Sequence, residues 1–93
     1  MQGLARVAHT LAEAAALQPG EILVTPITDI GWTPYFSLIG GLVTDLGSSV
    51  SHGAVIAREY GLPCVVNTRN GTRFFKIGER IELDGDSGVV RRL

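Results

Sequence analysis

The sequence predicts an α/β domain built on a central sheet of parallel strands. Two observations lead to this prediction. Short apolar segments suited to strands alternate with segments suited to helices, in the central order strand, helix, strand, helix, strand. The 12 glycines and 4 prolines divide these segments at short intervals. A chain of 93 residues has room for a single hydrophobic core, so residues 1–93 are expected to form one domain.

Six strands are expected from apolar or alternating runs of residues. They cover residues 5–9, 21–25, 42–44, 64–67, 80–83 and 89–92. The alternation over residues 5–9 is weak, which favours an edge strand. The last two strands are joined by turn-forming residues at 84–88, so they are expected to form a hairpin. This hairpin either extends the central sheet or adds a second layer.

Three helices are expected between the strands, over residues 11–17, 34–39 and 52–60. Thr10 is placed to cap the first helix. Thr33 and Pro34 predict the start of the second, because the missing N–H of a proline costs nothing at the first helical position. Residues 28–34 before it are expected to form a loop, and residues 69–71 a turn.

Charge and cysteine content exclude several classes of function. The chain has 8 basic and 9 acidic residues and no basic run, so a nucleic acid is not an expected partner. No apolar stretch reaches the roughly 18 residues that a membrane span needs, and no secretory leader is recognisable. The single cysteine, Cys64, lies in an apolar run and is expected to be buried in a reduced, cytoplasmic protein. No histidine or cysteine spacing predicts a metal site.

The most informative segment is Gly-Ser-Ser-Val-Ser-His-Gly-Ala, residues 47–54. It lies between an expected strand and an expected helix, where parallel sheets bind their ligands. The start of a helix offers unpaired N–H groups and a partial positive charge to an anion such as phosphate. His52 stands at this position, and an imidazole nitrogen can attack phosphorus and later release the phosphoryl group. From spacing alone, a capping or partly buried histidine remains the alternative.

Small and hydroxyl-bearing residues around His52 are the candidates for a phosphate site. These candidates are Thr44, Gly47, Ser48, Ser49, Ser51 and Gly53. The hydroxyls of Thr44 and Ser51 are the expected hydrogen-bond partners near the imidazole.

Three other residues are candidates for docking to a partner domain. Arg58 and Glu59 lie two helical turns after His52, too far to touch a phosphoryl group, so docking or plain solvation is expected for them. Trp32, the only tryptophan, is expected either to pack in the protein or to dock a partner. His9 lies outside the site and is expected to be structural or exposed.

Several of these segments together resemble a known signature. Leu42-Val43-Thr44, Gly47 and the run from Ser51 to Val66 resemble the phosphohistidine segment of enzymes that use phosphoenolpyruvate. These enzymes include phosphoenolpyruvate synthase, pyruvate phosphate dikinase, enzyme I of the sugar phosphotransferase system and rifampicin phosphotransferase. Residues 28–34, Thr-Asp-Ile-Gly-Trp-Thr-Pro, are similar to a segment of the synthase-like members, and residues 78–88 fit as well. The resemblance covers residues 20 to 93.

The resemblance implies a swivelling phosphohistidine domain with three layers, β/β/α. It implies that His52 is phosphorylated at one site and carries the group to another. In the synthase-like and rifampicin-modifying members, an ATP-grasp domain supplies the group from ATP. A second domain holds pyruvate or phosphoenolpyruvate with Mg²⁺, or the antibiotic. The chain is therefore expected to be one part of a larger phosphotransferase, to bind neither ATP nor metal itself, and to be inactive alone.

The sequence departs from the family at three places and leaves two other functions open. Ser51 stands where the family often has a threonine or a cysteine-like residue, and it keeps a hydroxyl. Gly47-Ser48 stands where the family often has two glycines, and Asn67 stands where a glycine is usual. The first alternative function is a docking or regulatory module that keeps the fold without accepting phosphate. The second is a small-molecule-binding domain with an anion site at the same helix. The final phosphoryl acceptor lies outside this segment.

Overall fold

The strands form one six-stranded sheet in the order β4-β3-β2-β1-β5-β6, in a computed structural model that describes residues 1–93. The strands are β1 (Gln2–Val7), β2 (Ile22–Thr25), β3 (Gly41–Thr44), β4 (Cys64–Val65), β5 (Arg80–Asp84) and β6 (Val89–Arg92). β1 to β4 pair in parallel, whereas β5 pairs antiparallel with both β1 and β6. The predicted parallel core and C-terminal hairpin are confirmed. The hairpin extends the sheet through β1.

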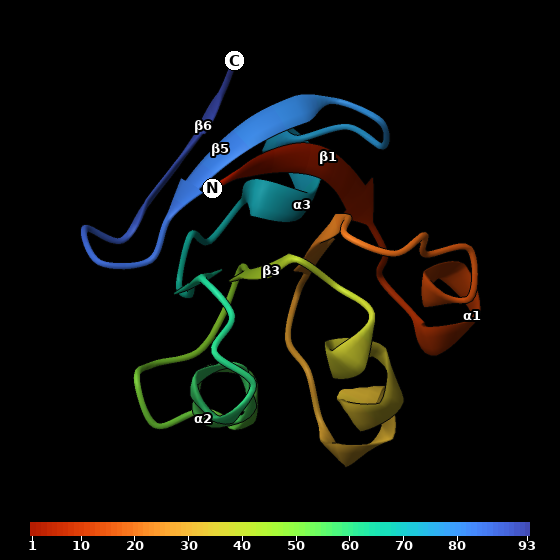
Figure 1. The fold of residues 1–93 in the computed structure, drawn as a ribbon, viewed down its shortest axis with the longest axis vertical. Helices are drawn as coiled ribbons and strands as arrows, with labels where there is room; N and C mark the ends of the chain where they lie inside the picture. Colours follow the sequence, from red (N-terminus) through yellow and green to blue (C-terminus); the bar gives the residue numbers. More distant parts are fainter.

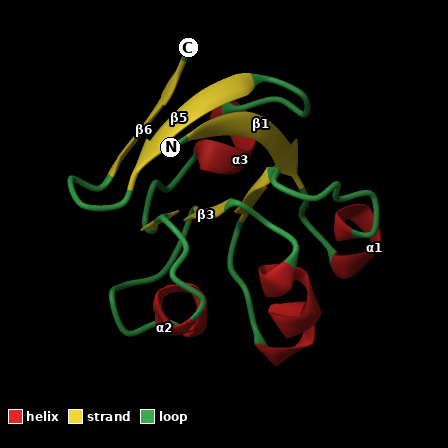
Figure 2. Ribbon diagram, viewed as in Figure 1, coloured by secondary structure: helices red, strands yellow, loops and turns green.

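The sheet curves so strongly that it supplies two of the three layers of the domain. In Figure 1, β1, β5 and β6 arch over the rest of the sheet. Figure 2 shows helices on the far side of the parallel strands, and one helix between the two parts of the sheet. The helices are α1 (Leu11–Ala14), the 3₁₀-helix η1 (Ile30–Ser37), α2 (His52–Glu59) and α3 (Gly71–Phe74). This is the predicted β/β/α arrangement, with α3 added between the β layers.

Two apolar clusters hold the three layers together. One lies between the parts of the sheet and joins Val43 and Val65 to Ile81 and Leu83. The other lies between the parallel strands and the helices. It contains Leu23, Leu42, Phe36 and Ala57, among others. Because successive side chains of a strand point to opposite faces, β2 and β3 contribute to both clusters. Parallel strands buried on both faces need continuous apolar runs, which these short segments supply.

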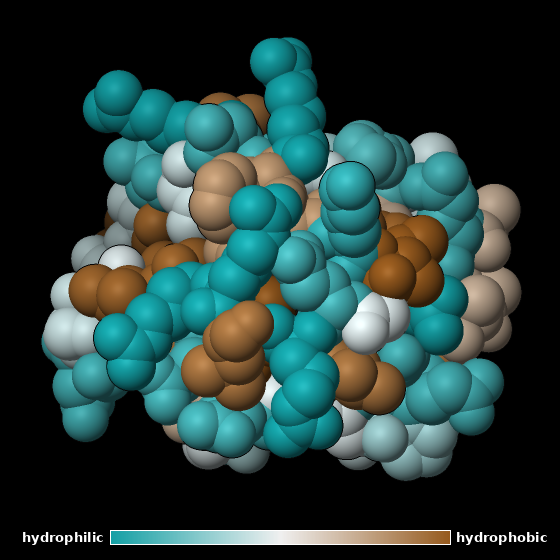
Figure 3. Space-filling model, turned by 90° about the horizontal axis from the view of Figure 1, so that it is seen from above, coloured by the Kyte–Doolittle hydropathy of each residue, from teal (hydrophilic) through white to brown (hydrophobic).

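The outer face of the arched strands is mixed in polarity. Figure 3 looks onto the molecule from above the view of Figure 1 and shows brown apolar patches broken up by teal hydrophilic side chains. This face therefore presents scattered apolar groups, which are normal on a protein surface.

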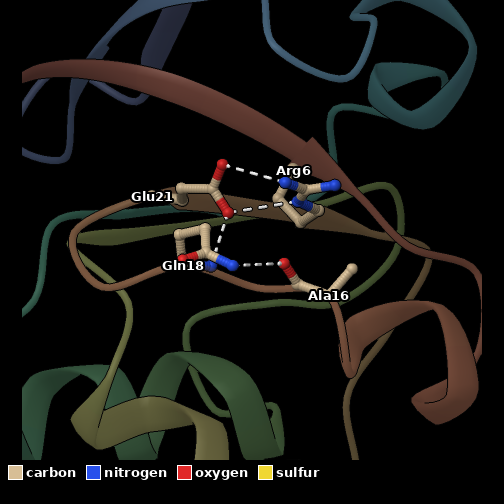
Figure 4. Close-up of polar contacts among 4 residues, drawn as sticks. All are labelled: Arg6, Ala16, Gln18 and Glu21. Atoms are coloured by element: carbon tan, nitrogen blue, oxygen red, sulfur yellow. Dashed lines mark hydrogen bonds and ion pairs between the residues drawn. The ribbon is translucent and has the colours of Figure 1, made fainter.

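A buried ion pair joins the beginning of β2 to β1. Arg6 donates two hydrogen bonds to the Glu21 carboxylate, at 3.1 and 3.2 Å. The backbone N–H of Gln18 donates a third to Glu21, at 2.7 Å (Figure 4). The Glu21 residue is only 8% exposed, so its charge needs these partners. The contact stabilises the sheet where β2 begins. The loops that follow β2 and β3 leave from the opposite ends of these strands.

The prediction of an edge strand over residues 5–9 is wrong. β1 begins at Gln2 and lies inside the sheet, between β2 and β5. Its second neighbour comes from the far end of the chain, since Gln2 pairs with Glu82. A local pattern carries no information about such a distant partner, so the weak alternation was a poor guide to position.

Two predicted helix boundaries also differ from the structure. The second helix begins at Ile30 instead of Pro34, because Asp29 caps it by accepting a hydrogen bond from the Gly31 N–H at 2.9 Å. It is a 3₁₀-helix, a form that suits short segments. The first helix is capped by Thr10 as predicted but covers only Leu11–Ala14, and the next two alanines are exposed. Packing therefore does not support a longer helix.

The segment after β4 holds a short helix that the sequence did not predict. β4 ends at Val65, and Asn67 and Arg69 both take positive φ angles, of 59° and 71°. These angles break the extended backbone, so the strand is shorter than the predicted 64–67. The chain then enters α3 at Gly71, within the predicted turn.

Candidate functional site

His52 is the first residue of α2, and two residues from the segment after β2 orient its ring. The Nδ1 atom of His52 lies 3.1 Å from the Oγ1 atom of Thr28. The ring of Phe36 meets the imidazole edge to face, with centroids 6.1 Å apart and an interplanar angle of 83°. His52 is partly exposed, and its Nε2 atom makes no hydrogen bond with the protein. One ring nitrogen is therefore held and the other is free.

Gly53 allows α2 to approach Thr28 closely enough for this contact. A Cβ atom built at Gly53 would lie 2.8 Å from Oγ1 of Thr28 and 3.1 Å from Leu42. Thr28 itself is only 4% exposed and has little room to move. Gly53, predicted as a phosphate-site residue, thus has a clear structural role in setting the distance between Thr28 and His52.

The loop before α2 is folded by its own glycine and serines. Gly47 has a φ of +122°, a conformation that favours glycine, and a Cβ there would lie 2.9 Å from the Ser51 hydroxyl. Ser51 donates a hydrogen bond to the Ser48 carbonyl at 2.8 Å, and the Ser48 hydroxyl accepts one from Val50 at 3.3 Å. Ser48 and Ser49 are exposed. These contacts turn the chain sharply into α2.

The first turn of α2 has no side-chain cap. Ser51 occupies the N-cap position with an extended backbone, but its hydroxyl is engaged with Ser48. The N–H groups at the start of α2 therefore meet no capping oxygen from a side chain. Such groups, together with the partial positive charge of the helix end, favour an anion beside the ring of His52.

The predicted hydroxyl partners of the imidazole are replaced by a different one. Thr44 is 2% exposed and donates its hydroxyl hydrogen to the Leu46 carbonyl at 2.7 Å. The Ser51 hydroxyl also serves a backbone carbonyl. Neither reaches the imidazole in this structure, and Thr28 makes the contact instead. Thr28 belongs to the segment that resembles the synthase-like members, but no local pattern ties it to His52.

A buried carboxylate supports the end of β3 from the other side. Asp45 is 8% exposed and accepts hydrogen bonds from the backbone N–H and the hydroxyl of Thr72, at 2.9 and 2.5 Å. The backbone N–H and hydroxyl of Thr68 both donate to the Thr44 carbonyl, at 3.1 Å each. The site loop therefore starts from a strand end that is fixed on both faces.

The candidate docking residues divide into exposed and buried ones. Arg58 and Glu59 are exposed in the last turn of α2. Trp32 is 5% exposed and belongs to the apolar cluster beneath the helices, so it packs and does not present its indole at the surface. The His9 side chain is 55% exposed and lies 3.4 Å from Glu13.

The single thiol of the chain, that of Cys64, is held in its protonated, unreactive form. Cys64, expected to be buried, is only partly buried. This partial burial raises the pKa of its thiol to about 11, and the nearby Arg58 lowers it only in part. A thiol with this pKa is almost entirely protonated near neutral pH and is a poor nucleophile. His, Cys, Asp and Glu side chains do not gather anywhere in groups of three that could hold a metal ion. None of the helices has the length and apolar character needed to cross a bilayer.

A free imidazole nitrogen lies beside an uncapped helix start, within the segment whose sequence resembles the phosphohistidine signature. Residues 17–88 match the family model described as the PEP-utilising enzyme, mobile domain, where PEP is phosphoenolpyruvate. The chain belongs to this family. The match covers β2 to β5 and so includes both loops that position His52.

Relatives of this mobile domain are parts of much longer proteins. Rifampicin phosphotransferase of Bacillus cereus is 52% identical over 93 residues, which are 100% of this chain and 11% of that protein. The prodigiosin synthesizing transferase PigC of Serratia marcescens is 50% identical over 84 residues, 90% of this chain and 10% of its own length. Chondramide synthase cmdD of Chondromyces crocatus is 49% identical over 92 residues, 99% of this chain and 2% of that protein.

A solved structure has the same fold. The solution structure of the Enzyme I (nEIt) protein superimposes with a TM-score of 0.72 at 28% sequence identity. The likeness covers 83% of this chain and 32% of that one. The α/β fold predicted for a mobile domain is therefore confirmed by an independent structure.

Proposed function

We propose that this mobile domain carries a phosphoryl group on the Nε2 atom of His52, between a donor site and an acceptor site on other domains. The observation that carries the proposal is the Thr28–His52 contact, which holds Nδ1 and leaves Nε2 free. The uncapped start of α2 beside the ring supports it, because the phosphoryl group is an anion.

The chemistry requires one particular form of the ring. Nδ1–H must donate to Thr28 Oγ1, which leaves the lone pair on Nε2. Nε2 then attacks phosphorus, the N–P bond forms, and the P–O bond to the leaving group breaks with its electron pair on that oxygen. The ring carries a positive charge until the Nδ1 proton leaves, and Thr28 accepts the hydrogen bond of that proton meanwhile. In the second half, an acceptor oxygen attacks the same phosphorus, the N–P bond breaks with its electron pair on Nε2, and Nδ1 regains a proton as the acceptor hydroxyl loses one.

The proposed partners are the domains that hold the phosphoryl donor and the phosphoryl acceptor. A carrier needs a donor such as ATP and an acceptor such as pyruvate or an antibiotic, both held elsewhere. We propose that an ATP-grasp domain supplies the donor with Mg²⁺, in keeping with the rifampicin phosphotransferase relative. Motion of this domain between the two sites belongs to the same proposal. A cytoplasmic setting, where ATP is available, is consistent with the single unpaired Cys64.

Radiolabelling of the full-length protein tests the proposal. The protein is incubated with ATP labelled at its phosphates, and the bound label is tested in acid and in base. We expect label that is lost in acid and kept in base, and that disappears in His52→Ala. His9→Ala is the matched control, because His9 is the other histidine of residues 1–93 and is exposed. Equal label in His52→Ala overturns the proposal. No label on a folded, partner-binding protein indicates the docking module instead.

A further inference from the structure

Four exposed aliphatic side chains lie in the two loops that position His52. They are Ile27, Ile30, Leu46 and Val50, here called the aliphatic rim, and they are 50%, 83%, 55% and 79% exposed. Ile27 directly precedes Thr28, and Ile30 is the first residue of η1. Both therefore belong to the segment that holds Nδ1 of His52.

The other half of the rim comes from the loop after β3. The N–H of Leu46 donates to the Pro26 carbonyl at 3.0 Å, so Leu46 and Ile27 lie at neighbouring strand ends. Val50 stands two residues before His52, and its N–H is fixed by the Ser48 hydroxyl at 3.3 Å. The rim thus has two members from the segment after β2 and two from the loop after β3, the two loops that position His52.

The rim is almost without charge. Among residues 27–30 and 46–51, Asp29 has the only charged side chain. Its carboxylate accepts the hydrogen bond that caps η1, from the Gly31 N–H at 2.9 Å. Exposed apolar residues concentrated in two adjacent loops, unlike single scattered ones, mark an interaction surface.

We infer that the aliphatic rim is the surface on which the phosphoryl-donor domain of the same longer protein docks; this rests on the proposed function. Transfer needs Nε2 within about 3.5 Å of the donor phosphorus, so the donor domain must cover the residues that flank His52. The relatives are long enough to hold such a partner, because the matched segment is 11% of the rifampicin phosphotransferase.

The chemistry of the partner surface follows from the rim. The rim supplies no cation, whereas a phosphoryl group on Nε2 brings negative charge. The donor domain must therefore present an apolar border around a cationic centre that holds the phosphates. When the border meets the rim, water is excluded from the N–P bond, which protects it from hydrolysis.

Two phosphoryl donors of different size test the inference. Potassium phosphoramidate is a small reagent that phosphorylates imidazole without docking, whereas ATP acts only through the donor domain. The full-length protein is made as wild type, as the double variant Ile30→Ser/Val50→Ser, and as Val89→Ser. Val89 is 50% exposed but lies in the C-terminal hairpin, so it is the matched control. Thermal unfolding verifies that each variant is folded, and the single variants are used if the double variant is not.

The expected result is that labelling from ATP is lost while labelling from phosphoramidate is kept. Labelling of His52 from ATP falls at least tenfold in the double variant, while labelling from phosphoramidate stays within twofold of wild type, and Val89→Ser matches wild type with both. Equal ATP labelling of the double variant and wild type overturns the inference but leaves the proposed function intact. A parallel fall with both donors also overturns it, because the substitutions then act on the ring itself. If wild-type His52 accepts phosphate from neither donor, the proposed function fails and the inference fails with it.

Discussion

The Thr28 hydroxyl lies 3.1 Å from Nδ1 of His52, although 24 positions separate the two residues in sequence. The contact joins the segment after β2 to the first residue of α2. It sets the direction of the imidazole and, with it, the nitrogen that remains available for chemistry.

Replacing Thr28 by valine removes this hydrogen bond without changing the shape of the side chain. A hydrogen bond of this kind is worth about 1 kcal/mol, so we expect the rate of His52 phosphorylation to fall about fivefold. Thr28→Ser keeps the hydroxyl and is expected to retain most of the rate. Nitrogen-15 NMR of the imidazole checks the cause, since valine should change the ring tautomer population. Equal rates for the valine and serine variants would show that the contact has no part in transfer.

Gly53→Ala is expected to destabilise the domain even though alanine favours helices. The helix preference is worth up to about 1 kcal/mol. The new Cβ would lie 2.8 Å from the Thr28 hydroxyl, and overpacking of this kind costs about 1–3 kcal/mol. We therefore expect a net loss of about 1 kcal/mol in the free energy of unfolding, measured by urea denaturation.

A double variant separates this clash from other effects of the same substitution. Thr28→Ala removes the atom that Gly53→Ala would strike. The two substitutions together should therefore cost less than the sum of the single variants. Strict additivity in the double-mutant cycle would contradict the proposed contact.

Glu21→Ala should lower stability without changing the chemistry at His52. The substitution leaves the Arg6 guanidinium and the Gln18 N–H without their buried acceptor (Figure 4). We expect a loss of about 2 kcal/mol in the free energy of unfolding, and an unchanged rate of phosphorylation for the folded molecules. Gln18→Ala is the matched control, because its bond to Glu21 uses the backbone. A loss of the same size in Gln18→Ala would rule out the carboxylate as the cause.

The Cys64 thiol should react slowly near neutral pH and become reactive only in alkali. With a pKa of about 11, roughly one thiol in a thousand is ionised at pH 8. Reaction with a maleimide should speed up as the pH rises toward 11, and denaturant should abolish the protection at pH 8. Fast labelling of the folded chain at pH 8 would contradict the burial of this thiol.

The same group makes stability depend on pH in a definite direction. The thiol ionises more readily in the unfolded chain, where its pKa is near the ordinary value of 9.0, than in the folded one. The contribution of the protonated thiol to the free energy of unfolding is therefore complete below pH 9 and is lost as the pH rises toward 11. Unfolding curves of wild type and Cys64→Ser, compared over this pH range, measure this contribution. Identical pH profiles of the two proteins would contradict the raised pKa of Cys64.

Local patterns predicted the parallel strands, the C-terminal hairpin and the helix that begins at His52. Each of these depends on residues that are close in sequence, such as the apolar run of β2 or the turn-forming residues between β5 and β6. The Thr10 cap was predictable for the same reason, since its hydroxyl meets the N–H of Glu13 only three residues away. The 3₁₀ character of η1 and the short helix α3 were missed, because backbone angles at single residues decide them.

By itself, the sequence determined the order of the six strands and of every helix except α3, and it placed one histidine at the start of a helix, because periodicity and capping act over a few residues. Only the tertiary structure decided that β1 lies inside the sheet, that Trp32 is buried, and that Thr28 orients the imidazole. These outcomes depend on which distant segments become neighbours when both faces of the parallel strands are covered. No stretch of a few residues encodes that choice, since it follows from the free energy of packing the whole chain at once.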